Sequence, residues 1–127
     1  MNLLLDTHAF IWFINGSREL PKPIINQVKS IDNNCFISIA SLLEISIKSS
    51  IGKLKLKSNF NNISDFLVDN EIEILPITFQ HLQKLTGLKY HHRDPFDRII
   101  ISQALVENIT IVTRDTEFSK YGVRLLW

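Results

Sequence analysis

The stretch NLLLDTHAFIWFI (residues 2–14) joins two apolar segments through a single acidic residue. Its first part, NLLL (2–5), is a short continuous apolar run, which is typical of a strand buried on both faces of a parallel sheet. Its second part, THAFIWFI (7–14), is predicted to be a helix that ends at the polar residues NGS (15–17). Asp6 therefore stands at the carboxyl end of a strand, and in parallel α/β sheets ligands bind at that edge.

Three further stretches carry acidic residues beside apolar runs. They are SLLEIS with Glu44, RDPFDR with Asp94 and Asp97, and IVTRDT with Asp115. Asp115 directly follows a strand-like segment, as Asp6 does, and the other three acids lie at or near helix starts. Because these positions share one edge of a parallel sheet, the acids are expected to meet in one pocket.

Strands and helices alternate along the chain. Further strands are expected at residues 35–38, 72–77, 110–113 and 123–127, and further helices at 23–31, 41–51, 63–70, 79–88 and 95–108, with a helical turn at 115–121. This alternation predicts an α/β protein in which a parallel sheet lies between two helical layers and the crossovers are right-handed. The length of 127 residues suits one domain, residues 1–127.

Two of the expected helices have well-marked features. In the helix at 41–51, the apolar residues Leu43, Ile47 and Ile51 recur at every fourth position, and Gly52 is its expected stop. The helix at 95–108 is expected to have Asp94 as its N-cap and a proline at its first position.

The composition is that of an ordinary globular protein, with 45% apolar and 21% charged residues. No apolar run approaches the ~18 residues of a membrane helix, and no signal peptide is recognisable, so we expect a cytoplasmic protein without membrane contact. The single cysteine, Cys35, lies in a strand-like segment and is interpreted as a small buried apolar residue.

The net charge of +1 differs from the strongly basic balance of a general nucleic-acid binder. Basic residues nevertheless gather in two segments, Lys48 to Lys57 and Lys89 to Arg98. Each segment is either a solvated face, which the first segment taken alone favours, or a set of phosphate contacts, for which the neighbouring acidic stretches argue.

Each acid also has a purely structural interpretation. Asp6 and Asp115 can cap the helical segments that follow them, and Asp97 occupies the third position of the helix that Asp94 caps. Glu44 is spaced for a surface ion pair with Lys48, one turn later.

These separate interpretations do not explain why neighbouring strand ends both carry aspartate. Carboxylates held close together repel each other, which raises their pKa values and lowers the stability of the fold. A bound divalent cation removes this loss of stability. A carboxylate pocket without histidine or cysteine ligands suits Mg²⁺ or Mn²⁺, which indicates metal-assisted phosphodiester cleavage. Thr7 can add a hydroxyl to a carboxylate or to a metal-bound water. Motifs for other chemistries are missing: there is no GxSxG, Walker loop, GxGxxG or CxxC.

Four blocks, in this order, resemble the PIN-domain family and, more narrowly, the VapC-type toxins of bacterial toxin–antitoxin pairs: LLLDTHAFIW, SLLEISIKSSIGKLKL, HHRDPFDRIIISQA and IVTRDTEF. The resemblance spans nearly the whole chain. It implies a five-stranded parallel sheet of order 3-2-1-4-5 and an endoribonuclease that uses Mg²⁺ or Mn²⁺. The family's acidic quartet falls on Asp6, Glu44, Asp97 and Asp115, which the resemblance makes both metal ligands and catalytic residues. Behind the quartet or beside the substrate it places Thr7, Lys48, Asp94, Arg98 and Thr113.

The implied mechanism is hydrolysis by a metal-bound water, with Asp6 and Asp97 as the main ligands. Glu44 and Asp115 hold metal-bound waters or a second ion. Two alternatives remain open. One is a metal-dependent phosphatase that acts on small phosphoesters, although the basic residues at 89–98 favour an extended substrate. The other is a non-catalytic PIN-like RNA-binding module.

The resemblance also implies partners: an RNA substrate, a cognate antitoxin whose tail enters the active-site groove, and a second copy of the chain in a homodimer. The segment AFIWFI (9–14) is apolar almost all round. We therefore expect Phe10, Trp12 or Phe13 to help form a surface for the antitoxin or for the second copy.

Overall fold

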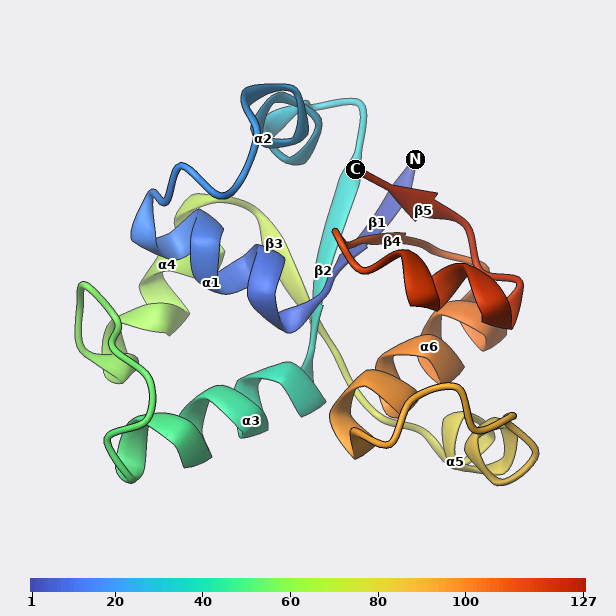
Figure 1. The fold of residues 1–127 in the computed structure, drawn as a ribbon. Coiled ribbons are helices and arrows are strands. Elements are labelled where there is room, and N and C mark those ends of the chain that lie inside the picture. Colours follow the sequence, from blue (N-terminus) through green and yellow to red (C-terminus); the bar gives the residue numbers. More distant parts are fainter.

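The computed structural model describes residues 1–127 and contains one five-stranded sheet between two helical layers (Figure 1). All neighbouring strands are parallel, in the order β3-β2-β1-β4-β5. The strands are β1 (Asn2–Leu5), β2 (Asn34–Ser38), β3 (Ile72–Leu75), β4 (Thr110–Val112) and β5 (Leu125–Leu126). The predicted three-layer architecture and strand order are confirmed.

The helices cover both faces of the sheet. They are α1 (Thr7–Asn15), α2 (Lys22–Lys29), α3 (Ile39–Ser50), α4 (Ile63–Asp69), α5 (Phe79–Thr86) and α6 (Pro95–Glu107), with short 3₁₀ helices η1 (Phe60–Asn62) and η2 (Thr116–Tyr121). Helices α1, α2 and α4 cover one face, and α5 and α6 cover the other. Helix α3 begins where β2 ends and contacts both α1 and α6. No helix has the length and apolar character needed to cross a lipid bilayer.

Strand β1 lies at the centre of the sheet and is buried on both faces, as its continuous apolar run predicts. Successive side chains of a strand point to opposite faces. Leu3 and Leu5 therefore join the core cluster that contains Phe10, and Leu4 joins the cluster that contains Ile100. The two clusters hold α1 and α6 on opposite faces.

Three strands are shorter than expected. Strand β3 ends at Leu75 because Pro76 has no N–H to donate to the ladder. Strand β4 ends at Val112, and the expected strand at 123–127 keeps only Leu125–Leu126. Helix α3 stops where predicted, since Gly52 adopts a φ of +72°, a conformation that glycine tolerates best.

Helix α1 is apolar almost all round, but none of its apolar side chains is exposed. Phe10 is fully buried, and the ring of Phe13 packs against Phe66 at 5.4 Å between centroids. Trp12 is covered by Trp127, 5.9 Å between centroids, and by the guanidinium of Arg114 at 4.5 Å. Phe10 therefore cannot form a partner surface, because it lies in the core, whereas the partner surface expected at Trp12 or Phe13, which are only partly buried, stays a prediction.

Helix α3 shows the opposite arrangement. Its apolar residues Ile39, Leu43, Ile47 and Ile51, here called the α3 stripe, expose 41 to 59% of their surface. Its buried side carries Ser41 and Glu44 as well as apolar residues. An apolar stripe normally faces the core. The spacing predicted the helix correctly, but its stripe faces outward because the inner side borders the acidic residues described next.

Candidate functional site

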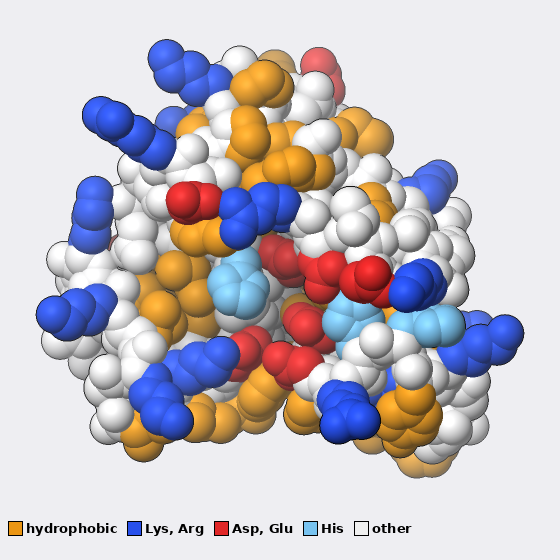
Figure 2. Space-filling model, viewed as in Figure 1, with side chains coloured by type: hydrophobic (Ala, Val, Ile, Leu, Met, Phe, Trp, Pro, Cys, Tyr) orange, Lys and Arg blue, Asp and Glu red, His pale blue; other side chains and the backbone are white.

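Five acidic side chains gather at the carboxyl edge of the sheet, and Figure 2 shows Asp and Glu around a hollow in the face drawn there. Asp6 lies between β1 and α1, Glu44 in α3, Asp94 and Asp97 at the start of α6, and Asp115 between β4 and η2. The negative charges of Asp94, Asp6 and Glu44 act on Asp97, and the charge of Asp115 acts on Asp6. The fold thus brings together acids that lie far apart in the sequence.

Asp6 is both a helix cap and a buried carboxylate. Its Oδ1 accepts a hydrogen bond of 2.8 Å from the backbone N–H of Ala9. Burial raises the pKa of Asp6, the hydroxyl of Thr113 and the Ala9 N–H oppose that rise, and the charge of Asp115 adds to it. Because the cap uses only one oxygen, capping and a role in the site are compatible.

Asp97 is a second carboxyl group of this edge whose pKa is raised. Burial and, to a smaller extent, the nearby charge of Asp94 raise its pKa from 3.8 to about 7, while the charge of His92 opposes this rise. Asp94 itself is exposed and caps α6 as predicted, since its Oδ1 accepts from Phe96 N at 2.8 Å. Asp97 therefore stands in a partly dry and negatively charged space.

Glu44 forms the expected pair with Lys48, but this is not a surface pair. The distance from Lys48 Nζ to Glu44 Oε2 is 2.7 Å, with the Glu44 side chain 5% exposed and that of Lys48 45% exposed. The hydrogen bond from Lys48 to Glu44 raises the pKa of Lys48, and the charges of Asp94 and Asp97 also raise it. Lys48 is thus a cation at the border of the acidic hollow.

Thr113 connects the strand ends of β1 and β4. Its Oγ1 accepts from the backbone N–H of Asp115 at 3.0 Å, and its hydroxyl lowers the pKa of Asp6 through a hydrogen bond. One threonine therefore touches both aspartates that follow strands.

Two other expected site residues have different roles in the structure. The Thr7 hydroxyl donates to Ser41 Oγ at 2.9 Å in a buried contact between α1 and α3, not to a carboxylate. Arg98 is buried, and its guanidinium donates to the carbonyls of Lys89 (2.8 Å) and Leu88 (3.1 Å). Arg98 was expected behind the quartet or beside the substrate, and in the structure its guanidinium holds the loop before α6.

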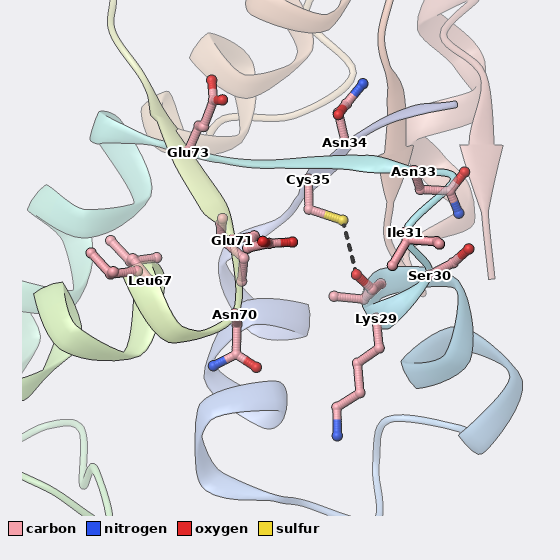
Figure 3. A pocket seen from close by; sticks show the side chains of 13 residues that line it. Lys29, Ser30, Ile31, Asn33, Asn34, Cys35, Leu67, Asn70, Glu71 and Glu73 are labelled. Carbon is pink, nitrogen blue, oxygen red and sulfur yellow. Dashed lines mark hydrogen bonds between the residues drawn. The ribbon is translucent and has the colours of Figure 1, made fainter.

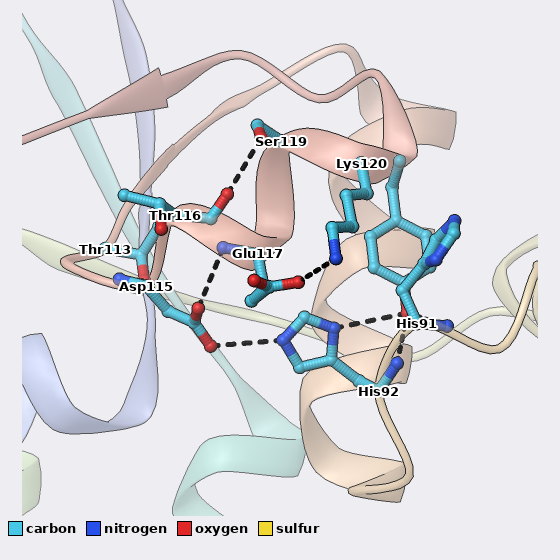
Figure 4. Close-up of polar contacts among 9 residues, drawn as sticks. His91, His92, Thr113, Asp115, Thr116, Glu117, Ser119 and Lys120 are labelled. Carbon is cyan, nitrogen blue, oxygen red and sulfur yellow. Dashed lines mark hydrogen bonds and ion pairs between the residues drawn. The ribbon is translucent and has the colours of Figure 1, made fainter.

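The contact of His92 with Asp115 was not predicted from the sequence. Asp115 Oδ2 lies 3.1 Å from Nε2 of His92, and Oδ1 accepts from Glu117 N at 2.9 Å, which caps η2 as predicted (Figure 4). The sequence placed His92 only among basic residues near a possible phosphate. Its position two residues before Asp94 was the one available signal.

The donor set suits a hard cation bound largely through water. No group of three or more His, Cys, Asp or Glu side chains is arranged as a ready-made shell for one ion. Mg²⁺ does not need such a shell, because it keeps several waters and is held by one or two carboxylates together with substrate phosphates. The carboxyl groups of Asp6 and Asp97, neither of which has a basic partner in an ion pair, fit that mode of binding.

The opposite edge of the sheet holds a separate cavity of about 480 Å³ (Figure 3). It is lined by Lys29, Glu71 and Glu73 among others, and the Cys35 thiol points to the Val28 carbonyl at 3.3 Å. Burial raises the pKa of Cys35 to about 11, which agrees with its interpretation as a buried apolar residue. None of the five gathered acids lines this cavity.

Comparison with known proteins identifies the family. The sequence pattern of the PIN domain matches residues 3–124, so the chain belongs to the PIN-domain family. No curated protein sequence matches the chain.

Solved structures show the same fold. A chain of VapBC2 from Rickettsia felis, bound to a promoter DNA fragment, matches with a TM-score of 0.75 and 22% identity over 99% of this chain and 98% of that one. A chain of VapBC-1 from nontypeable Haemophilus influenzae matches with a TM-score of 0.71 and 19% identity over 99% of this chain and 97% of that one. A chain of a toxin–antitoxin complex from Klebsiella pneumoniae matches with a TM-score of 0.67 and 16% identity over 98% of this chain and 96% of that one.

Proposed function

We propose that this PIN-domain protein, as one domain over residues 1–127, is the toxin of a toxin–antitoxin pair and hydrolyses RNA with Mg²⁺ or Mn²⁺. The observation that carries the proposal is the gathering of carboxylates around Asp97, whose pKa is raised by burial and by Asp94, Asp6 and Glu44. Crowded carboxylates of this kind cost stability unless a cation neutralises them. The PIN fold and the VapBC structures that resemble it support the same conclusion.

The residues have separate tasks in this proposal. Asp6 and Asp97 hold the metal ion, and Glu44 and Asp115 hold waters around it or a second ion. A bound divalent ion lowers the pKa of a water and offsets the charge that develops on phosphate. Lys48 brings a half-exposed positive charge to the border of the hollow, where a backbone phosphate can bind.

The two alternatives fit the structure less well. A phosphatase for small phosphoesters suits a closed pocket, whereas the acidic side chains surround a hollow that is open on the surface (Figure 2). A non-catalytic RNA-binding module has no need for the costly charge around Asp97.

Incubation with total RNA separates these functions. We expect cleavage with Mg²⁺, none in excess EDTA, full recovery with Mn²⁺ and poor recovery with Ca²⁺, whose longer and looser coordination misplaces the attacking water. Asp6→Ala is the control for contaminating ribonuclease. Turnover of p-nitrophenyl phosphate without RNA cleavage would favour the phosphatase, and RNA binding without cleavage would favour the binding module. Cleavage that persists in EDTA, while Asp6→Ala is inactive, would overturn the metal mechanism.

We also propose a protein antitoxin, expected together with this chain in the cytoplasm. The comparison structures are VapBC and toxin–antitoxin complexes, which supports a partner of this kind. Co-expression with a small partner encoded in the same operon is expected to give a stable complex without RNA cleavage. Full cleavage by the purified complex would contradict the proposal.

The α3 stripe supports the proposed homodimer. A groove of about 430 Å³ beside it is lined by Ile39, Leu43, Phe60 and Ile77, among others. A straight apolar stripe on one helix can pack against its own copy around a two-fold axis. We therefore assign this surface to a second copy of the chain.

A further inference from the structure

The hydroxyl group of Tyr121 holds the loop that leads into α6. Its oxygen accepts hydrogen bonds from two consecutive backbone N–H groups, those of His91 (3.0 Å) and His92 (2.6 Å) (Figure 4). A hydroxyl oxygen has two lone pairs, so these two bonds use its accepting capacity. The hydrogen of the hydroxyl group is then left to donate, and Nδ1 of His92 lies 3.2 Å away.

This bond determines the tautomer of His92. If Nδ1 accepts from Tyr121, the neutral ring carries its hydrogen on Nε2. Nε2 faces Asp115 Oδ2 at 3.1 Å and therefore donates to it. The ring is also held edge-on against Phe118, at 4.9 Å between centroids. Both hydrogen bonds of the series Tyr121, His92, Asp115 then run in one direction, from the tyrosine hydroxyl to the carboxylate.

The series leaves Asp115 little freedom. Its side chain is 42% exposed, so solvent alone would let it rotate. Instead, Glu117 N holds Oδ1 and His92 holds Oδ2. Each carboxylate oxygen has a second lone pair that stays available.

The series also connects two parts of the site. His92 belongs to the loop that precedes Asp94 and Asp97, whereas Tyr121 and Asp115 belong to the segment after β4. We propose that His92, held in one tautomer by Tyr121, is a positioning residue that fixes the carboxylate of Asp115 relative to the acids of α6. This inference rests on the proposed function, because it takes Asp115 to be part of a metal site.

The tautomer is tested directly by two-bond ¹H–¹⁵N correlation of the histidine rings in the metal-free chain, near pH 8. The His92 signals are identified by their loss in His92→Gln. We expect the pattern of hydrogen on Nε2 in the wild type, and a mixture of tautomers in Tyr121→Phe, which removes only the hydroxyl. Hydrogen on Nδ1, or the same mixture in both proteins, would overturn the inference.

Positioning is tested by Mn²⁺ affinity, measured from the electron paramagnetic resonance of free Mn²⁺. Groups that orient a metal ligand change affinity by roughly tenfold or more when removed, so we expect that loss in Tyr121→Phe and His92→Phe. His92→Gln should retain most of the affinity, because its amide N–H can replace Nε2–H. His91→Phe is the matched control: its side chain contacts Tyr121 but not Asp115, and its affinity should equal that of the wild type.

The outcomes separate this inference from the function it rests on. Thermal unfolding of each variant confirms that it is folded. If the wild type does not bind Mn²⁺, the proposed function fails, and the role of His92 in metal binding fails with it. If the wild type binds and both phenylalanine variants bind equally well, only the inference fails. A loss in His92→Gln as large as in His92→Phe assigns the ring to packing and also overturns it.

Discussion

Helices α1 and α3 leave neighbouring strands at the same edge of the sheet, but α3 buries a carboxylate among its apolar side chains and α1 does not. Helix α1 follows β1 and turns Phe10 fully into the core. Helix α3 follows β2, buries Glu44 and Ser41, and leaves Leu43 and Ile47 exposed. The Thr7 hydroxyl bonds Ser41 where the two helices meet.

The difference shows what an apolar pattern can and cannot tell. In α1 the core takes the apolar side chains, because no functional group occupies the space beneath the helix. In α3 part of that space belongs to carboxylates, and apolar residues on the outer side are free to bind a partner. Five predictions test this comparison, and those on stability and self-association run from the largest expected effect to the smallest.

Truncation of a core ring should cost far more than truncation on the α3 stripe. Phe10→Ala is expected to lower the free energy of unfolding by about 4 kcal/mol, because it leaves a cavity in a closed core. Leu43→Ala, on a side chain that is 54% exposed, should cost less than about 1 kcal/mol. Urea unfolding at a low protein concentration measures both. Similar losses would show that the stripe packs within the monomer.

The charge between α3 and α6 should make stability depend on pH. The pKa of Asp97 is raised from 3.8 to about 7 in the folded protein, so the folded state binds this proton more tightly than the unfolded state does. The contribution of the Asp97 proton to stability is therefore complete below pH 3.8 and is lost as the pH rises to about 7. Near pH 8 in EDTA, Asp97→Asn should therefore be more stable than the wild type by about 2 kcal/mol, and near pH 4 the two should be alike. Thermal unfolding across this range gives the result.

The same variant should no longer cleave RNA in Mg²⁺, because one of the two main carboxylates is gone. A folded Asp97→Asn protein with full activity would remove Asp97 from the site. A constant stability difference from pH 4 to 8 would instead show that Asp97 ionises normally.

The α3 stripe should control self-association. Leu43→Glu with Ile47→Glu places two charges on it and should weaken the dimer at least tenfold, or by about 1.4 kcal/mol. Ile31→Glu is the control, since Ile31 is 94% exposed and lies outside the stripe. Sedimentation velocity over a range of concentrations measures the effect. A wild type that stays monomeric, or a control that dissociates as much, would contradict the assignment.

Two ion pairs of equal length should differ slightly in strength. Arg114–Glu19 beside α1 and Lys48–Glu44 on α3 both measure 2.7 Å, but only the second has a buried partner. Glu19→Gln should change stability by less than about 0.5 kcal/mol, because both its groups are exposed. Lys48→Met should cost about 1 kcal/mol, because it leaves the buried Glu44 carboxylate without its partner. Urea unfolding at two salt concentrations distinguishes them, and equal losses would contradict the role of burial.

The sequence predicts most of the fold because its signals are local. The apolar run of β1 requires burial on both faces, and glycine or polar residues end the helices near the expected positions. The gathering of Asp6 and Asp115 was also predictable, since both follow parallel strands. Local signals do not say which side of α3 faces the core, because periodicity defines a face without giving its direction.

Hydrogen-bond partners were the least predictable part of the site. Arg98 looked like a phosphate contact, but the loop before α6 folds back and presents its carbonyls to the guanidinium. The contact of His92 with Asp115 joins residues 23 positions apart, and it exists only once that loop and η2 are packed together. Such partners depend on tertiary structure and leave no spacing pattern in the sequence.

The contact between the indole rings of Trp12 and Trp127 gives the protein an intrinsic fluorescence probe. These are the only two tryptophans, so all indole fluorescence comes from the place where the segment after β5 lies on α1. Loss of that contact exposes both rings to water and shifts the emission to the red. The emission spectrum therefore reports directly whether residue 127 is seated on α1.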